Sequence, residues 1–356
     1  MMYRWIGRRR VVVIVTAIAL NLLLAGLVRA DTDPYLRVMT YNLYLGADLQ
    51  PIITAPPDQV VAEVKDAWHH VRATNFKIRA EAIADLITEE HPHLAGLQEV
   101  SLWQTAPIDD PTHLTTKYDF LDLLLRELEQ NGTPYEAVVR NPFASAVLPV
   151  SEDKLLRFTQ RNVIIAPAGR DEDVFAVTDP VSVVYQARIP LTILGQPLEI
   201  TRGYASLDVR FHGSWVRFAT TQPEAYSVPI RQLQAMELAG ALSTSPYDVI
   251  VAGDINSERE FTGDSYQILI AAEYTDVWLE TMPGVDGFTA SFGDDLIGPP
   301  EELDHTVDYV LWTSDGCLDG VEGSGDVVGE EIDDQTTTGW WPSDHAGVVV
   351  SLDIVC

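Results

Sequence analysis

Apolar residues recur along the chain with two different periods, which predict strands and helices. The segment 36–42, LRVMTYN, alternates as a strand does, whereas the segments 74–90, 118–132 and 229–242 have helical spacing. Further β-rich runs lie at 91–99, 135–140, 162–166, 181–189, 197–211, 214–221, 247–256, 304–312 and 346–355. Many strands with interspersed helices, several strands being in hairpin-like succession, predict an α+β domain in which sheets are packed between helices.

The first 30 residues have a different pattern. Arg4 and Arg8–Arg10 precede an apolar run from Val11 to Val28, and Val28-Arg29-Ala30 is an acceptable cleavage site for a secretory leader. The run approaches the length of a short transmembrane helix, so an uncleaved anchor is the alternative. Both interpretations place residues 31–356, which contain no linker and are predicted to form a single domain, outside the cytoplasm.

The charge of the chain bears on its substrate. There are 53 acidic and 23 basic residues, for a formal net charge of −30. Such a surface repels nucleic acid at long range and mildly favours a small or lipid substrate over polymeric DNA. Nuclease activity is not excluded, because bound metal ions can invert the local field.

Only two cysteines are present, Cys317 and Cys356, and there is no Cys/His zinc pattern. In an oxidising compartment the two are expected to pair, two unrelated thiols being the alternative. Nothing in the sequence indicates an obligate protein partner, so a monomer is expected. Contact with a membrane is expected only through a lipid substrate or an uncleaved N-terminal anchor.

Acidic residues, asparagines and one histidine lie at the ends of the predicted strands. A buried carboxylate inside an apolar run, as in VDYV, is costly unless it is paired. Any single case fits an ordinary turn, but together they indicate a site. The residues concerned are Asn42, Glu99, Asp254, Asn256, Asp308, Asp344 and His345.

This set suits metal-assisted hydrolysis of a phosphoric ester. A hard cation such as Mg²⁺, or Mn²⁺ or Ca²⁺ in its place, takes oxygen ligands, which Asn42, Glu99 and Asp344 supply. The cation offsets charge in the transition state, and a carboxylate or imidazole handles the proton of the nucleophile. The sequence therefore predicts a secreted, divalent-metal-dependent phosphoesterase.

Six motifs in order resemble the endonuclease/exonuclease/phosphatase superfamily, which has the DNase-I-like fold. They are MTYNLYLGADL, GLQEV, RGYASLDV, VAGDINS, VDYVLW and WWPSDHAGVV, and the resemblance covers roughly residues 36–354. The first and last look like those of a secreted bacterial branch. The resemblance implies a four-layer α/β/β/α sandwich with its site at one mouth of the paired sheets.

The resemblance also implies roles for individual residues. Asn42 and Glu99 match metal-binding positions, and Asp254 and Asn256 match the pair that contacts the nucleophile and the phosphate. The substrate is then most simply a phosphodiester, either a phospholipid at its headgroup or a nucleic acid.

The terminal motifs carry the remaining implied roles. Asp344 matches a position that reaches the metal shell, and His345 matches the phosphate-contacting histidine, oriented by Asp308. Arg202 and Tyr204 match a motif that lines the pocket in relatives, although a hairpin bend at Gly203 explains the same residues.

One position departs from the family pattern. Relatives similar to DNase I and sphingomyelinases carry a histidine where this chain has Gln222. Glutamine can donate a hydrogen bond to a phosphoryl oxygen but cannot transfer a proton. A degenerate, non-catalytic binding protein of the same fold is therefore the alternative to the phosphodiesterase.

Overall fold

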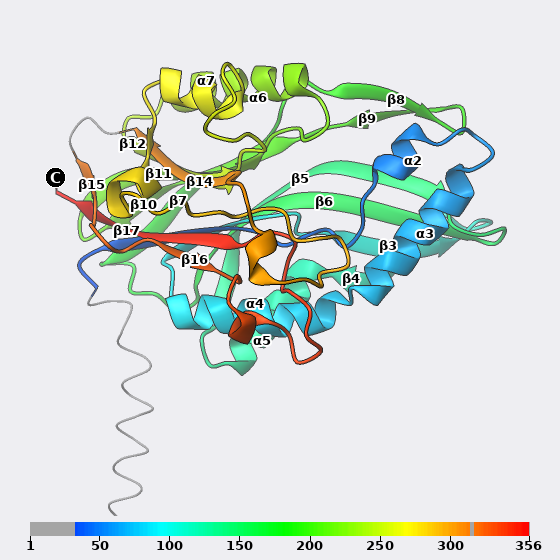
Figure 1. Cartoon of the computed structure of the whole chain (residues 1–356), viewed down its shortest axis with the longest axis horizontal. Helices are drawn as coiled ribbons and strands as arrows, with labels where there is room; N and C mark the ends of the chain where they lie inside the picture. The colour runs from blue at the N-terminus through cyan, green and yellow to red at the C-terminus, as the bar shows by residue number, and fades with distance from the viewer. Residues whose placement is uncertain (1–32, 314–316, 356) are drawn as a thin grey trace, which may run out of the picture.

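The computed structural model describes residues 33–313 and 317–355 (Figure 1). The predicted leader at 1–30 and Cys356 lie outside the described residues. Cys317 is disulfide-bonded. Among the described helices, none is long and apolar enough to cross a membrane.

The first sheet contains the N-terminal and C-terminal strands side by side. Its strands run in the order β15-β17-β1-β2-β6-β3-β4, with β16 paired to β17 and β5 paired to β6. Their bounds are β1 (Leu36–Asn42), β2 (Leu94–Gln98), β3 (Leu102–Pro107), β4 (Thr115–Asp119), β5 (Tyr135–Pro149), β6 (Lys154–Pro167), β15 (Leu318–Gly320), β16 (Asp326–Val328) and β17 (Gly347–Ile354).

The second sheet is smaller and runs in the order β13-β14-β12-β11-β10-β7. A separate hairpin, β8 with β9, pairs only with itself. The bounds are β7 (Phe175–Val184), β8 (Ile189–Ile193), β9 (Gln196–Ile200), β10 (Gly203–Phe211), β11 (Ser214–Gln222), β12 (Asp248–Asp254), β13 (Thr275–Asp276) and β14 (Asp308–Thr313).

Helices cover the outer face of each sheet, which gives the predicted four-layer α/β/β/α arrangement. In Figure 1, α4 and α5 lie below the sheets and α6 and α7 above them. The helices are α2 (Gln50–Thr54), α3 (Val60–Ala73), α4 (Phe76–Glu90), α5 (Phe120–Gln130), α6 (Val228–Leu242), α7 (Ser265–Ala271) and α8 (Val277–Thr281), with 3-10 turns at Pro300–Glu302 and Ile332–Asp334.

Three apolar cores separate these layers. The first lies between α4, α5 and the larger sheet, where the rings of Phe76 and Phe120 stack with centroids 3.7 Å apart. The second fills the space between the two sheets. The third lies between the smaller sheet and the helices α6 and α7. Each sheet therefore buries both faces, which explains why its central strands are almost continuously apolar.

The sheets approach each other closely at one edge. A Cβ added to Gly96 would lie 2.7 Å from Thr220 Oγ1 across the interface, so only glycine fits there. Beside it, the buried Gln98 donates to Thr220 Oγ1 at 2.8 Å and to Thr40 Oγ1 at 3.1 Å. These contacts fix β1 and β2 against β11 in one register.

Strand direction explains why the predicted site residues share this edge. β1 and β2 are parallel, as are β11 and β12, so Asn42, Gln222 and Asp254 end their strands there. β14 is antiparallel to β12 and begins at the edge, with Asp308 opposite Asp254. β17 is antiparallel to β1 and begins directly after the loop that carries His345.

The strands of one region are longer than the sequence predicted. β5 continues beyond residue 140 to Pro149, and β6 spans Lys154–Pro167 rather than 162–166 alone. Their outer halves mix exposed and partly buried residues with a few buried ones, and they include polar residues and two prolines, so they lack the apolar run that marked their inner halves.

Candidate active site

Asp254 is the centre of the polar cluster at this edge. Its Oδ2 accepts hydrogen bonds from the amide groups of Asn42 at 3.1 Å and Asn256 at 3.3 Å. Its Oδ1 accepts from the backbone N–H of Asn256 at 2.9 Å. The carboxylate is almost fully buried, so these donors hold it in one orientation. The structure thus brings together three of the residues that the sequence singled out.

Glu99 reaches the cluster through an unusual backbone conformation. It has φ 56° and Asn256 has φ 53°, both in the left-handed region that non-glycine residues seldom adopt. Such conformations are found most often where side chains are aimed for function. The Glu99 carboxylate accepts from Leu45 N at 2.7 Å and from Gln222 Nε2 at 2.8 Å.

The partly buried His345 and the buried Asp308 form a pair, with Nδ1 of the imidazole 2.8 Å from Oδ2 of the carboxylate. Burial alone would lower the pKa of His345, but the charge and hydrogen bond of Asp308 raise that pKa well above its ordinary value. Burial raises the pKa of Asp308 to about 6, against the opposing effect of His345. The pair therefore favours an imidazolium whose Nε2 remains available to a substrate.

Asp344 lies beside this pair, where the basic His345 and Arg79 and the acidic Glu99 all act on its carboxyl group. Burial raises the pKa of its carboxyl group to about 7, and the negative charge of Glu99 raises it further, while His345 opposes the shift. Ser343 Oγ donates to Asp344 Oδ1 at 3.3 Å and to the backbone oxygen of Asn42 at 2.7 Å. Asp344 and Glu99 are thus acidic neighbours, as the predicted metal shell requires.

The donor set fits a hard divalent cation. Among the described residues, no Lys or Arg forms an ion pair with Glu99, Asp254 or Asp344. Carboxylate and amide oxygens close to one another, without an ion-paired Lys or Arg, suit Mg²⁺, Mn²⁺ or Ca²⁺. The described residues also include a compact group that could hold a metal ion, formed by Asp254, Asp308 and His345. The predicted ligands Glu99, Asp344 and Asn42 differ from this group, and their role in binding a cation stays a prediction.

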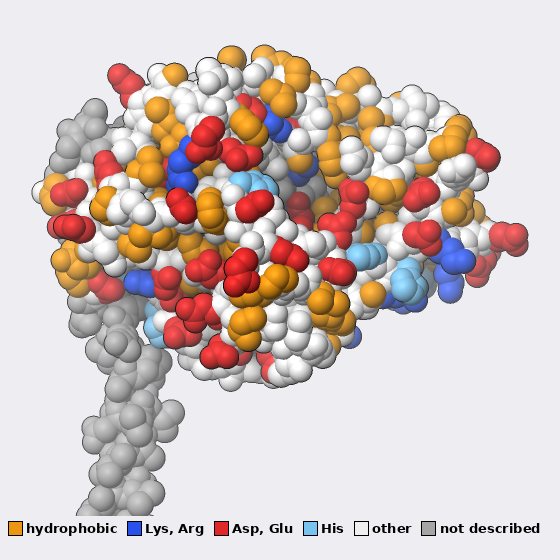
Figure 2. All heavy atoms as spheres, in the orientation of Figure 1, with side chains coloured by type: hydrophobic (Ala, Val, Ile, Leu, Met, Phe, Trp, Pro, Cys, Tyr) orange, Lys and Arg blue, Asp and Glu red, His pale blue; other side chains and the backbone are white. Residues whose placement is uncertain are grey.

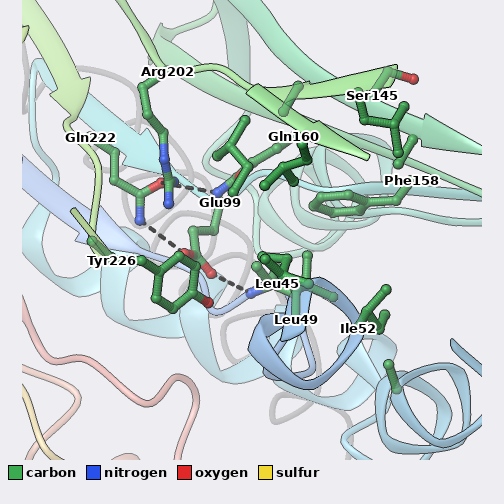
Figure 3. A pocket seen from close by; sticks show the side chains of 18 of the residues that line it. Leu45, Leu49, Ile52, Glu99, Ser145, Phe158, Gln160, Arg202, Gln222 and Tyr226 are labelled. Atoms are coloured by element: carbon green, nitrogen blue, oxygen red, sulfur yellow. Dashed lines mark hydrogen bonds between the residues drawn. The ribbon is translucent and has the colours of Figure 1, made fainter. Parts of the chain in front are cut away.

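Gln222 lies between the carboxylates (Figure 3). Its Nε2 donates to Glu99 and, at 3.1 Å, to Asp254 Oδ2. Its Oε1 accepts from Arg202 at 2.8 Å and from Gln160 at 3.0 Å. Two donors on the oxygen fix which way the amide points, so its N–H groups face the carboxylates. A contact between Gln222 and phosphate stays a prediction.

Arg202 and Tyr204 of the RGY motif lie in different parts of the structure. Arg202 lines the cavity beside Gln222 and pairs with the buried Glu224, its Nε donating at 3.2 Å. Tyr204 is buried in the core between the smaller sheet and its helices, where its ring packs on Tyr185. The structure does not bring Tyr204 to the cavity, because Tyr204 lies within β10 and faces the helices, whereas Arg202 precedes the strand.

Arg79 is a site residue that the sequence analysis missed. Its guanidinium is fully buried and donates to the backbone oxygens of Leu43, Tyr44, Thr74 and Pro342 at 2.7 to 3.1 Å. Burial lowers its pKa to about 10. It thereby joins the loop that follows Asn42 to the loop that precedes Asp344. Its position three residues after Phe76 puts it on the buried face of α4, a signal visible in the sequence.

A family model matches the chain over residues 39–345 and covers all of these site residues. The chain belongs to the Endonuclease/Exonuclease/phosphatase family. This family comprises phosphoesterases and nucleases, so the general class of the protein is a hydrolase of phosphoric esters. None of the curated proteins matches the chain.

Solved structures share the fold of this family member at low identity. An endonuclease/exonuclease/phosphatase from Bacteroides vulgatus has a TM-score of 0.55 at 12% identity, covering 90% of this chain and 99% of that one. One from Beutenbergia cavernae has a TM-score of 0.53 at 22% identity, covering 90% and 72%. A mannosyl-6-phosphatase from Bacteroides thetaiotaomicron has a TM-score of 0.52 at 13% identity, covering 89% and 99%.

Proposed function

We propose that the protein is a divalent-metal-dependent phosphodiesterase in which water attacks phosphorus. The observation that carries the proposal is the pair of the buried Asp308 with His345 next to Asp254, within one polar cluster. A binding protein has no need of a carboxylate that holds an imidazole in its charged form.

The residues divide the work of the reaction. A bound cation would supply positive charge against the negative charge that develops on the phosphoryl oxygens. Asp254, held by the amides of Asn42 and Asn256, takes the proton of the attacking water as the new P–O bond forms. His345, oriented by Asp308, donates a hydrogen bond to a phosphoryl oxygen, and a water molecule protonates the departing oxygen once its bond to phosphorus has broken.

Hydrolysis of 4-nitrophenyl methyl phosphate tests the proposal. We expect turnover with Mg²⁺, Mn²⁺ or Ca²⁺ and its loss with a chelator, and water labelled with ¹⁸O should leave its label in methyl phosphate. Asp308→Asn should lower turnover by about 10²-fold or more, because it removes the charge that holds the imidazolium. The exposed Asp319→Asn is the matched control. Label in nitrophenol would contradict attack on phosphorus.

The alternative is a binding protein that cannot catalyse hydrolysis, because Gln222 stands where relatives have a histidine. It predicts metal binding, measured by calorimetry, without hydrolysis of any diester. Turnover that depends on both metal and Asp308 would exclude it.

We infer further that the domain acts outside the cytoplasm as a monomer. The basic and apolar pattern of the first 30 residues and the disulfide-bonded Cys317 support this location. N-terminal sequencing of the exported protein and its mass in solution by light scattering are the tests. A stable dimer, or a reduced cytoplasmic protein, would overturn this inference.

A further inference from the structure

The cluster of polar residues is only one end of a larger cavity. A cavity of about 270 Å³ begins at Glu99, Gln222 and Asp254 and continues over apolar side chains. Figure 3 shows both parts, with Arg202, Gln222 and Glu99 at one side and Leu49 and Phe158 at the other. We call these the polar end and the apolar end of the cavity.

The apolar end is built by elements that extend beyond the edge of the sheets. The outer halves of β5 and β6 contribute Leu148, Leu156 and Phe158 to one wall. The short helix α2 contributes Ile52, and the neighbouring α3 contributes Ala67. These strands and helices pack against one another only in part, which leaves the space open.

The hairpin β8–β9 closes the cavity from another side. Leu191 and Leu198, which pair across the hairpin, both line the apolar end. Both are only partly buried although they are large and apolar, because part of their surface faces the cavity. An apolar lining of this kind is typical of a site for an apolar ligand.

The charges in the cavity exclude a polyanion at the apolar end. The basic residues of the described lining are His345 and Arg202, both near the polar end, and Arg202 is already held by Glu224 and Gln222. Glu199 is the acidic residue away from the polar end, and its side chain is half exposed and pairs with Arg188. Figure 2 shows Asp and Glu side chains spread over the face viewed, with few Lys or Arg among them. A nucleic-acid strand would find no cation there for its successive phosphates.

Hydrogen-bonding groups for a sugar are also scarce at the apolar end. Trp103 Nε1 already donates to Leu45 O at 3.1 Å, and Ser145 Oγ lies 3.3 Å from Thr159 Oγ1. Apart from Glu199, the remaining described side chains that line this end are aliphatic or aromatic. An occupant with hydroxyl groups would lose its hydrogen bonds to water there without replacement.

We propose that the apolar end binds the hydrocarbon chain of an amphiphilic phosphodiester whose phosphate lies at the polar end. The substrate class is then a lipid phosphodiester. This inference rests on the proposed function, because it uses the polar end as the phosphate site. The continuity of the two ends in one cavity requires a ligand that carries both a charged ester and an apolar chain.

The apolar N-terminal run of the chain is the other candidate occupant. Asp33, where the described residues begin, is held by His212, whose Nε2 lies 2.9 Å from Asp33 O. His212 lies at the turn between β10 and β11, at the end of these strands opposite Gly203 and Gln222. The described chain therefore begins at the far end of the smaller sheet from the cavity.

Binding of straight-chain alkylphosphonates, from ethyl to decyl, tests the inference without turnover. The measurement is titration calorimetry on the full chain, with saturating Mg²⁺ and below the micelle-forming concentration. We expect affinity to rise about two- to fourfold per CH₂ group, since burial of one CH₂ contributes about 0.8 kcal/mol. The heat-capacity change of binding should become more negative with chain length.

Two variants of adjacent residues make the test specific. Ala146→Trp places an indole in the apolar end and should remove the gain from long chains, because Ala146 lines the cavity. Val147→Trp is the control, since Val147 is exposed and is not part of the lining. If Ala146→Trp does not fold, Ile53→Asn on α2 replaces it in the test. This variant adds a polar group at a partly buried lining position and should also reduce the gain from long chains. An affinity independent of chain length, or equal gains in the folded lining variants and the control, would overturn the inference. The lining variants and the control would also show equal gains if the alkyl chain of the ligand bound elsewhere, such as to the N-terminal run of the protein.

Hydrolysis assays then show which class of lipid is cleaved. They also distinguish failure of this inference from failure of the proposed function. Lysophosphatidylcholine and sphingosylphosphorylcholine each present one chain on a phosphodiester, and cleavage of either supports the inference while naming the lipid class. If 4-nitrophenyl methyl phosphate is cleaved but both lipids are not, the inference fails and the proposed function stands. Faster cleavage of an oligonucleotide than of both lipids would also overturn the inference. If no diester is cleaved but alkylphosphonates bind with the expected gain, the proposed function fails and the apolar site stands.

Discussion

The polar and apolar ends of one cavity are held together by different forces. At the polar end, Glu99, Gln222 and Asp254 are linked by hydrogen bonds of 2.8 to 3.1 Å, and Glu99 has a strained backbone. At the apolar end, side chains such as Leu148 and Phe158 meet without directional bonds. A hydrogen bond is lost entirely when one partner is removed, whereas the free energy of apolar contact changes in proportion to the buried area. Single substitutions should therefore have large effects at the first end and graded effects at the second.

Glu99→Gln should have the largest effect on activity. The substitution keeps the shape of the side chain but removes one charge from the predicted cation shell, on which affinity for hard cations depends. We expect turnover to fall by about 10³-fold or more, because a bound cation contributes several kcal/mol to the transition state. Glu81→Gln, at an exposed position on α4, is the control. Unchanged metal affinity by calorimetry in the folded variant would sink the ligand assignment.

Arg79→Lys tests whether the polar end depends on a buried clamp behind it. Lysine keeps the charge but cannot reach four backbone oxygens with a planar fork. We expect the free energy of unfolding to fall by about 3 kcal/mol, because buried carbonyl groups lose their donors. Denaturant unfolding measures the effect, with the exposed Arg72→Lys on α3 as the control. Equal unfolding midpoints for the two variants would show that the clamp does not matter.

Gln222→His tests how the polar end handles the departing oxygen. Without a dedicated acid at this position, wild type should slow steeply from nitrophenyl esters to alkyl esters. A histidine between the carboxylates of Glu99 and Asp254 would be charged, and we expect it to raise the rate on alkyl esters by about tenfold. The measurement is a series of diesters with graded leaving groups at saturating metal, with Gln222→Asn as the control. A shallow slope in wild type would mean that another residue already serves as the acid.

Leu148→Ala should have the smallest effect and sharpens the contrast between the ends. Truncation of one partly buried lining residue removes apolar contact in proportion to its area. We expect the affinity for decylphosphonate to fall by about three- to tenfold, corresponding to about 1 kcal/mol, and that for ethylphosphonate to change less. A loss as large for ethyl as for decyl would mean that Leu148 supports the polar end rather than the chain.

Much of the polar end was predictable from local pattern. Asn42, Asp254 and His345 each stand where an apolar strand ends or begins, and the parallel and antiparallel pairings put those positions at one edge. The strand predicted at 36–42 agrees with β1, and the helix predicted at 74–90 overlaps α4 at Phe76–Glu90. Periodicity and motif order are properties of neighbouring residues, so a single sequence carries them.

Other features needed the folded chain. Gln160 meets Gln222 across 62 residues and Arg79 meets Pro342 across 263, and neither contact leaves a local pattern. Tyr204 was expected at the cavity but lies in the core between the smaller sheet and its helices, whereas Arg202, just before β10, reaches the cavity. The apolar end arises from elements that fail to pack fully against one another. A leucine that lines a cavity and a leucine that fills a core are the same letter in a sequence, and only tertiary packing decides which space remains open.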